Sequence, residues 1–123
     1  MLFNLFKERD FLIASIQAAL TDDDLVKLRN ELVRQVCSSH PRGVIVDVTG
    51  LDVMDSFAVR TLGDLARMSR LRGAETVIVG IQPEIGLAMA QSGLTLEGVA
   101  TELDLEEGLA HLDRATEGKI KVK

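Results

Sequence analysis

Short runs of branched apolar residues recur along the chain and predict β-strands. A near-continuous apolar run such as Val44–Val48 is typical of a strand buried on both faces of a sheet. A short polar break at Glu8–Asp10 separates the first two runs and favours an antiparallel hairpin. The predicted strands are Leu2–Lys7, Phe11–Gln17, Val44–Val48, Thr76–Gly80 and Val99–Glu102.

Segments with helical periodicity separate most of these strands. Four helices are predicted to begin near Thr21, Ser56, Pro83 and Asp104, with Thr21 as an N-cap and Pro83 at a first helical position. In the second helix, Gly63 is expected to mark close packing against a neighbouring element. The first helix carries one apolar stripe, which consists of Leu25, Leu28, Leu32, Val33 and Val36.

The order of these elements predicts an α/β fold. Strands that are separated by helices pair in parallel through right-handed crossovers. We therefore expect a mixed, mostly parallel sheet of about five strands with about four helices. Residues 1–117 are expected to form one domain, followed by a short basic tail at 118–123.

Composition and charge narrow the range of functions. A net charge of −5 argues against a nucleic-acid interface, which needs a basic surface. The single cysteine, Cys37, is interpreted as a small buried apolar residue, with a redox thiol as the alternative. The N-terminal sequence does not resemble a signal peptide, and no apolar run suits a membrane helix, so we expect a cytoplasmic protein without membrane contacts.

The segment Val44–Phe57 holds the most informative candidate site. It carries a buried strand into a loop that ends at Asp55 and Ser56, where a helix is predicted to begin. Backbone N–H groups are unpaired at a helix start and favour an anion there. A phosphate on Ser56 would also lie near Asp52 and Asp55, and would change the charge of the local surface. The alternative is that Ser56 is only a capping or first-turn residue.

Four further residues complete the predicted partner-binding surface around Ser56 and Asp55. Met54 and Phe57 are candidates for docking a partner, although both could instead belong to the core. Arg60 and Arg67 are spaced to extend this surface along the outer face of the helix. The alternative for the arginines is a solvated surface with an Arg60–Asp64 ion pair.

Two motifs resemble a known family. The sequence VIVDVTGLDVMDSF at 44–57 resembles the strand, loop and helix start that carry the phosphorylatable serine of STAS-domain anti-sigma factor antagonists. The sequence VIVGIQPEIG at 77–86 resembles a second signature of the stressosome branch, and Asp55-Ser56-Phe57 is more similar to RsbS-type than to RsbR-type proteins. Phe57 departs from simpler antagonists, where a small residue follows the serine.

The resemblance implies a function for the chain. Ser56 matches the serine that an RsbT-type switch kinase phosphorylates, and Asp55 matches the acidic residue before it. Such a protein sequesters the kinase in a large stressosome assembly with RsbR-type paralogues and copies of itself. Phosphorylation releases the kinase, and an RsbX-type phosphatase resets the serine. The resemblance implies neither enzymatic activity nor a cofactor or metal.

Three other functions compete with this one. A serine hydrolase would need a base beside Ser56, and only His40 and His111 are available, with no G-x-S-x-G motif. A receiver-like domain would be phosphorylated on Asp47, but the acidic pair that holds magnesium is missing after the Phe11–Gln17 strand. A nucleotide could bind at 80–86, although neither a Walker lysine nor G-x-G-x-x-G is present.

Overall fold

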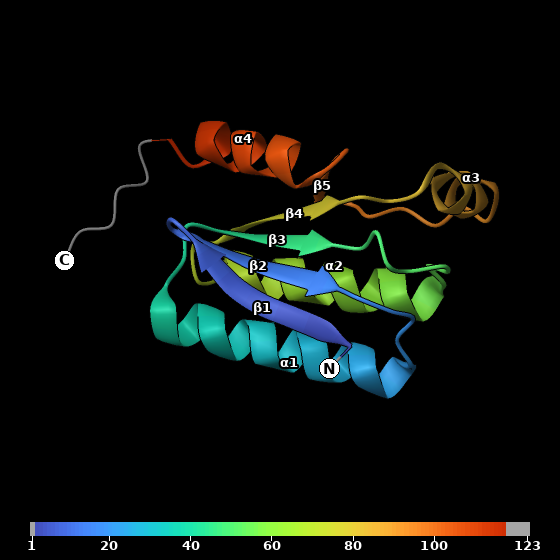
Figure 1. The fold of residues 1–123 in the computed structure, drawn as a ribbon, viewed down its shortest axis with the longest axis horizontal. Helices are drawn as coiled ribbons and strands as arrows, with labels where there is room; N and C mark the ends of the chain where they lie inside the picture. The colour runs from blue at the N-terminus through green and yellow to red at the C-terminus, as the bar shows by residue number, and fades with distance from the viewer. Residues whose placement is uncertain (1, 118–123) are drawn as a thin grey trace.

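The computed structural model describes residues 2–117, so the predicted basic tail at 118–123 lies outside the described residues. Within this part of the chain, five strands and four helices follow one another as an α/β fold (Figure 1). In chain order they are β1 (Phe3–Glu8), β2 (Phe11–Ile16), α1 (Asp22–Ser39), β3 (Gly43–Asp47), α2 (Ser56–Arg70), β4 (Glu75–Val79), α3 (Pro83–Gln91), β5 (Ala100–Glu102) and α4 (Leu105–Ala115).

The sheet has the predicted mixed, mostly parallel topology. Its strand order is β1-β2-β3-β4-β5, so each strand lies beside its neighbours in the sequence. The β1–β2 pair is antiparallel and the other three pairs are parallel, as the hairpin and the intervening helices predicted. β1 and β5 form the two edges.

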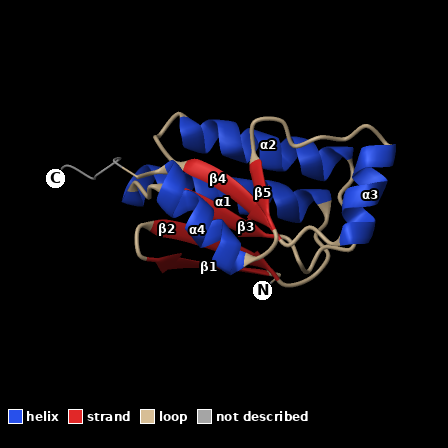
Figure 2. Cartoon of the chain, turned by 90° about the horizontal axis from the view of Figure 1, so that it is seen from above, coloured by secondary structure: helices blue, strands red, loops and turns tan. Residues whose placement is uncertain are grey.

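Helices cover the sheet unequally. α1 and α2 lie on one face, α4 lies on the other, and α3 lies beyond the carboxyl ends of the parallel strands (Figures 1 and 2). The larger core lies between the sheet and the α1–α2 layer, and contains the predicted stripe residues Leu25, Leu28, Leu32 and Val36. The smaller core lies under α4 and contains Leu112. Both faces of β2 and β3 are therefore buried, which explains their near-continuous apolar sequences.

Local capping interactions determine where two helices begin. Thr21 is the predicted N-cap of α1: its Oγ1 accepts a hydrogen bond from Asp24 N at 3.1 Å, and its own N–H donates to Asp24 Oδ2 at 3.0 Å. The pKa of Asp24 is lowered, chiefly because the backbone N–H of Thr21 donates to its carboxylate and favours the ionised form. At α4, Asp104 Oδ1 accepts a hydrogen bond from Glu107 N at 2.9 Å, which caps the helix where the sequence predicted it to begin.

Two predictions about packing are wrong. A Cβ on Gly63 would meet nothing closer than the Arg67 guanidinium of its own helix, at 3.4 Å, so this glycine does not mark a close contact with another element. A helical glycine that does mark such a contact is Gly108 in α4, where a Cβ would lie 2.7 Å from Val79 Cγ1. Cys37 is only half-buried, because it lies at the margin of the α1 stripe and not on it.

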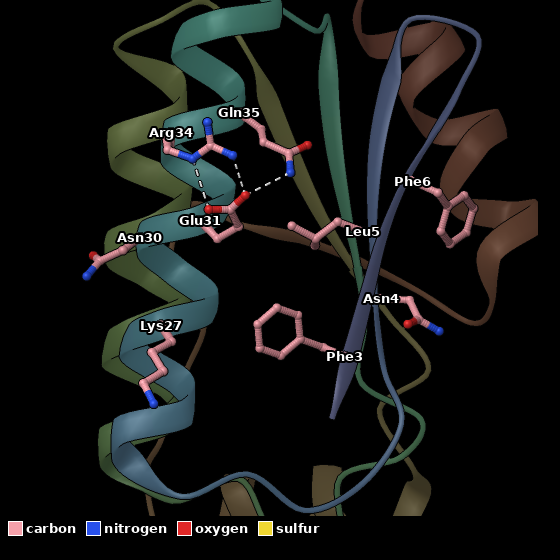
Figure 3. A pocket seen from close by; sticks show the side chains of 9 residues that line it. All are labelled: Phe3, Asn4, Leu5, Phe6, Lys27, Asn30, Glu31, Arg34 and Gln35. Atoms are coloured by element: carbon pink, nitrogen blue, oxygen red, sulfur yellow. Dashed lines mark hydrogen bonds and ion pairs between the residues drawn. The ribbon is translucent and has the colours of Figure 1, made fainter. Parts of the chain in front are cut away.

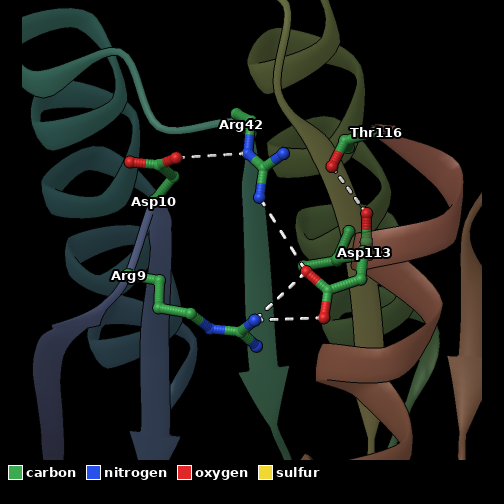
Figure 4. A network of polar contacts seen from close by, with 6 residues as sticks. Arg9, Asp10, Arg42, Asp113 and Thr116 are labelled. Carbon is green, nitrogen blue, oxygen red and sulfur yellow. Dashed lines mark hydrogen bonds and ion pairs between the residues drawn. The ribbon is translucent and has the colours of Figure 1, made fainter. Parts of the chain in front are cut away.

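The amino ends of the parallel strands are joined by a polar network that we call the arginine cluster, defined as Arg9, Asp10, Arg42 and Asp113 (Figure 4). Arg9 Nη1 lies 3.1 Å from Asp113 Oδ2, and Arg42 bridges Asp10 at 3.4 Å and Asp113 at 3.8 Å. Both guanidinium groups also stack on the buried ring of Phe11, 5.0–5.4 Å from its centroid. The cluster thus joins the β1–β2 turn to β3 and α4.

None of the helices within residues 2–117 is both long enough and apolar enough to cross a membrane.

Candidate functional site

The candidate site lies at the other end of the sheet, where β3 leads into the loop before α2. Asp47 ends β3, and its Oδ1 accepts hydrogen bonds from Thr49 N at 3.0 Å and Thr49 Oγ1 at 2.6 Å. Thr49 O in turn accepts a hydrogen bond from Gln82 Nε2 at 2.8 Å, which ties the loop to the start of α3. Asp47 therefore has a structural role in shaping this loop.

The glycine that directly follows β4 makes this loop conformation possible. Gly80 has φ +81°, and a Cβ at this position would lie 2.1 Å from Thr49 Oγ1 and 2.9 Å from Asp47 Oδ1. Only glycine combines this backbone conformation with such a close approach. The segment 80–86, considered above for nucleotide binding, thus has a packing role beside the Asp47–Thr49 pair.

Ser56 occupies the first helical position of α2, as the sequence predicted. The cap is the preceding residue: Asp55 Oδ1 accepts a hydrogen bond from Ala58 N at 2.9 Å. The Ser56 side chain is exposed and has no hydrogen-bond partner among residues 2–117. Its hydroxyl is therefore accessible to a partner, while Asp55 already satisfies one of the free N–H groups at the helix start.

The structure exposes a different apolar side chain beside Ser56 from the ones that the sequence predicted as docking residues. Met54 is 5% exposed and belongs to the larger core, and the half-buried Phe57 packs against that core. The side chain that points into solvent is Val53, which is 67% exposed. Met54 was therefore a poor choice as a docking residue. Sequence reasoning missed Val53 because a loop has no periodicity from which the inward side chain could be identified.

Ser56 lines a cleft between the β3–α2 loop and α3, which we call the Ser56 cleft. Its volume is about 520 Å³, and its apolar lining includes Ile85 and Ala88 of α3. Three carboxylates, those of Asp52, Asp55 and Glu84, line it without any basic side chain. The contribution of α3 was also missed, because its sequence predicted only a helix and gave no indication of what the helix faces. The remaining lining residues are Val53, Met54, Ser92 and Leu94.

Arg60 and Arg67 do not enter the Ser56 cleft. Both are exposed and line a shallow groove on the outer face of α2, about 160 Å³ in volume, together with Glu97. Arg67 forms an ion pair with Asp64, so the alternative Arg60–Asp64 pair is not the one that forms. Arg60 has no ion-pair partner within the described part of the chain and lies one helical turn from Ser56.

Neither histidine lines the Ser56 cleft. His40 caps the C-terminus of α1 in the left-handed conformation, with φ 50°. His111 Nδ1 lies 2.8 Å from Glu102 Oε2, which joins α4 to β5. The lining of the cleft therefore offers Ser56 no imidazole that could act as a general base.

Comparison with known proteins adds independent information about this arrangement. The fold superimposes on a Ser-to-Glu variant of RsbS from Moorella thermoacetica with a TM-score of 0.79 and 28% identity, covering 93% of this chain and 97% of that one. A chain from a structure of the stressosome, described as a signal integration and transduction hub, aligns with a TM-score of 0.71 and 27% identity, covering 93% and 99% of the two chains.

A curated relative and a family model extend the comparison. The RsbT co-antagonist protein RsbRA of Bacillus subtilis is 28% identical over 94 residues, which is 76% of this chain and 34% of the relative. The chain thus spans about a third of the length of that relative. The STAS domain model matches residues 4–108, which run from the second residue of β1 to the start of α4 and include the whole Ser56 cleft. The chain therefore belongs to the STAS domain family, with the fold of stressosome and anti-sigma factor antagonist proteins.

Proposed function

We propose that this chain is a stressosome antagonist that binds an RsbT-type serine kinase at the Ser56 cleft and releases the kinase when Ser56 is phosphorylated. The observation that carries the proposal is the exposed, unpartnered Ser56 hydroxyl at the start of α2, on the rim of a cleft. The chain acts as a binding module and not as an enzyme. Its other partners are RsbR-type paralogues, copies of itself and an RsbX-type phosphatase, in a cytoplasmic assembly.

Electrostatics provides a physical basis for release. A phosphate adds about −1.5 to −2 charges at neutral pH, beside the three carboxylates of Asp52, Asp55 and Glu84. No cation lines the cleft, and Arg60 lies outside it on the outer face of α2, so a phosphate that faces the cleft stays strongly hydrated. A partner that covers the apolar surface of Val53 and Ile85 would have to desolvate this anion, which opposes binding.

The structure refines which residues we propose as kinase contacts. Ser56 and Asp55 stay in the proposed contact surface, and Val53 takes the place of the buried Met54. Arg60 is retained as a contact one turn along α2, while Phe57 contributes only its exposed edge. Arg67 lies farther along the helix and is already paired with Asp64, so we expect its contribution to be smaller.

The relatives support this proposal over phosphorylation of an aspartate. RsbRA is named as a co-antagonist of RsbT, and the matched RsbS structure carries a glutamate in place of a serine. Asp47, the aspartate of the competing receiver-like function, is engaged by Thr49 through two hydrogen bonds. Phosphoserine is stable in acid and labile in base, so the stability of the phosphorylated protein distinguishes the two.

The test is a phosphorylation assay with the cognate RsbT-type kinase and ATP, with the site mapped by mass spectrometry. We expect one acid-stable phosphate on Ser56, absent from the Ser56→Ala variant. Ser92 provides a matched control, because it is an exposed serine that lines the same cleft. Ser92→Ala should be phosphorylated like the wild type. A phosphate on Ser92, or no phosphate on either serine, would refute the assignment.

A further inference from the structure

One face of α2 carries a row of arginines that starts at Ser56. Residues spaced by four and three positions lie on the same face of a helix. Along α2 this spacing joins Ser56 to Arg60, Gly63, Arg67 and Arg70, which we call the arginine row. The glycine is buried and the other four side chains are exposed. The proposed phosphorylation site therefore lies at one end of a row of cations.

The segment that follows α3 runs beside the arginine row. Two of its residues, Ser92 and Leu94, line the Ser56 cleft. Two others, Leu96 and Glu97, line the shallow groove that contains Arg60. Because one continuous segment borders both hollows, the cleft and the groove adjoin along α2. A group attached to Ser56 can therefore face either the cleft or the groove.

Two helical arginines of this protein already pair with an anion about one turn before them. In α1, Glu31 accepts hydrogen bonds from Arg34 and Gln35 (Figure 3), and these lower the pKa of Glu31 to about 2. In α2, Arg67 forms an ion pair with Asp64. In both pairs the anion lies N-terminal to the cation, which is the favoured order on a helix.

Arg60 has the same position on its helix but lacks the anion. The two residues one turn before it are uncharged, and one of them is Ser56. Asp64, one turn after it, pairs with Arg67. Glu97 lines the same groove, but its carboxylate forms no ion pair with Arg60 within residues 2–117. Phosphorylation of Ser56 would supply the anion at the position that is missing one.

We propose that Arg60 pairs with the phosphate once Ser56 is phosphorylated, and that this pair withdraws Arg60 from the kinase-binding surface. The Cβ atoms of residues four positions apart on a helix lie about 5–6 Å from each other. The long Arg60 side chain leans toward the N-terminus of α2, where Ser56 lies. Its guanidinium can donate two parallel hydrogen bonds to the phosphate. The inference rests on the proposed function, because it concerns the state that phosphorylation of Ser56 creates.

The pair adds a second cause of kinase release. In the complex, a phosphate facing the cleft would lie near Asp52, Asp55 and Glu84 and would have to lose its hydration. In the free domain, the same phosphate turns to the outer face of α2 and is partly neutralised by Arg60. Binding of the kinase then requires this pair to break. The cost in the complex and the gain in the free domain both favour release.

The direct test is a ³¹P NMR titration of protein that carries genetically encoded phosphoserine at position 56, so that no kinase is needed. The carboxylates of the cleft and Glu97 raise the pKa of the phosphate, whereas Arg60 and the start of α2 lower it. Only the difference between variants is therefore informative. We expect Arg60→Gln to raise the phosphate pKa by about 0.5, because the dianion loses its cation.

Arg67→Gln is the matched control, because it removes the same side chain from the same row. Arg67 lies about 16 Å from Ser56 along the helix axis, which is beyond the Debye length of about 8 Å in physiological salt. This variant should leave the phosphate pKa within about 0.1 of the wild-type value. An unchanged phosphate pKa in Arg60→Gln, or an equal rise in Arg67→Gln, would overturn the proposal.

Kinase affinity, measured with and without phosphoserine at position 56, tests the withdrawal of Arg60. We expect phosphoserine to weaken binding of the RsbT-type kinase about threefold less in Arg60→Gln than in the wild type, since the variant has neither the contact nor the pair to lose. An equal loss in both proteins would overturn the withdrawal. Equal affinity of the phosphorylated and unphosphorylated wild type would refute the proposed function and the withdrawal together, whereas the phosphate pKa would still decide whether the pair forms.

Discussion

The two ends of the sheet carry similar polar residues but use them differently. At the amino ends of the parallel strands, the charges of the arginine cluster satisfy one another across three segments of the chain. At the carboxyl ends, the side chains of Asp52, Ser56 and Glu84 have no hydrogen-bond or ion-pair partner within residues 2–117. One end pairs its charges within the domain, and the other presents free polar groups around an apolar cleft.

This difference separates stability from binding. A side chain whose interactions are made within the domain contributes to folding, and its loss is measured as a lower free energy of unfolding. A side chain without such interactions contributes little to folding and is available for a partner.

Gly80→Ala should have the largest effect on stability, because the loop that leads to Ser56 packs closely against Gly80 through the side chains of Thr49 and Asp47. We expect the free energy of unfolding to fall by about 3 kcal/mol, since a Cβ would clash with Thr49 Oγ1 at a positive φ. Urea denaturation measures this loss. Gly93→Ala is the control: it has φ +71° and nothing within 4 Å of a Cβ, so it should lose only about 1 kcal/mol. Equal losses would contradict the steric explanation.

Arg42→Ala should lower the stability of the domain without changing its affinity for the kinase. The Arg42 side chain is 22% exposed, contacts two carboxylates and stacks on Phe11. Its removal should lower the free energy of unfolding by about 1–2 kcal/mol. Arg72→Ala, the loss of an exposed arginine in a turn, should change stability by less than about 0.5 kcal/mol. A large loss of kinase affinity in folded Arg42→Ala would contradict the claim that the arginine cluster contributes to stability and not to binding.

Asp55 tests the boundary between the two roles, because it caps α2 and also lines the cleft. Asp55→Ala should lower the free energy of unfolding by about 1 kcal/mol, since the Ala58 N–H loses its acceptor. Asp55→Asn keeps an acceptor at the cap and should stay within a few tenths of a kcal/mol. Comparison of kinase affinity for Asp55→Asn and the wild type then isolates the contribution of the charge. If Asp55→Asn is as unstable as Asp55→Ala, the capping role is wrong.

Val53→Ser should have the smallest effect on stability. Val53 is 67% exposed, so we expect a change of less than about 0.5 kcal/mol in the free energy of unfolding. Its affinity for the kinase should nevertheless fall, because an apolar contact of the cleft is lost. Leu71→Ser is a suitable control, since Leu71 is also strongly exposed but lies at the far end of α2. Equal kinase affinity for Val53→Ser and the wild type would exclude Val53 from the docking surface.

The sequence predicted the fold more completely than the site. Periodicity, together with capping residues such as Pro83 and Asp104, located the nine elements of residues 2–117, because buried strands and amphipathic helices repeat their apolar positions and helix starts carry characteristic residues. The Thr21 cap and the start of α2 at Ser56 were also predicted, since capping depends on neighbouring residues. Local patterns could not predict Val53 pointing outward, α3 facing Ser56, or Asp64 pairing with Arg67. These depend on loop geometry, on how a helix docks, and on the choice between an ion pair spaced by four residues (Arg60–Asp64) and one spaced by three (Asp64–Arg67).

If the charge on Ser56 controls kinase binding, kinase retention should differ among the wild type, Ser56→Asp and Ser92→Asp. Both variants add one carboxylate to the same cleft, but only Ser56 lies at the start of α2. We predict that Ser56→Asp binds the RsbT-type kinase at least about tenfold more weakly, a loss of about 1.4 kcal/mol, while Ser92→Asp binds within about threefold of the wild type. Equal retention of the kinase by Ser56→Asp and the wild type would contradict the claim.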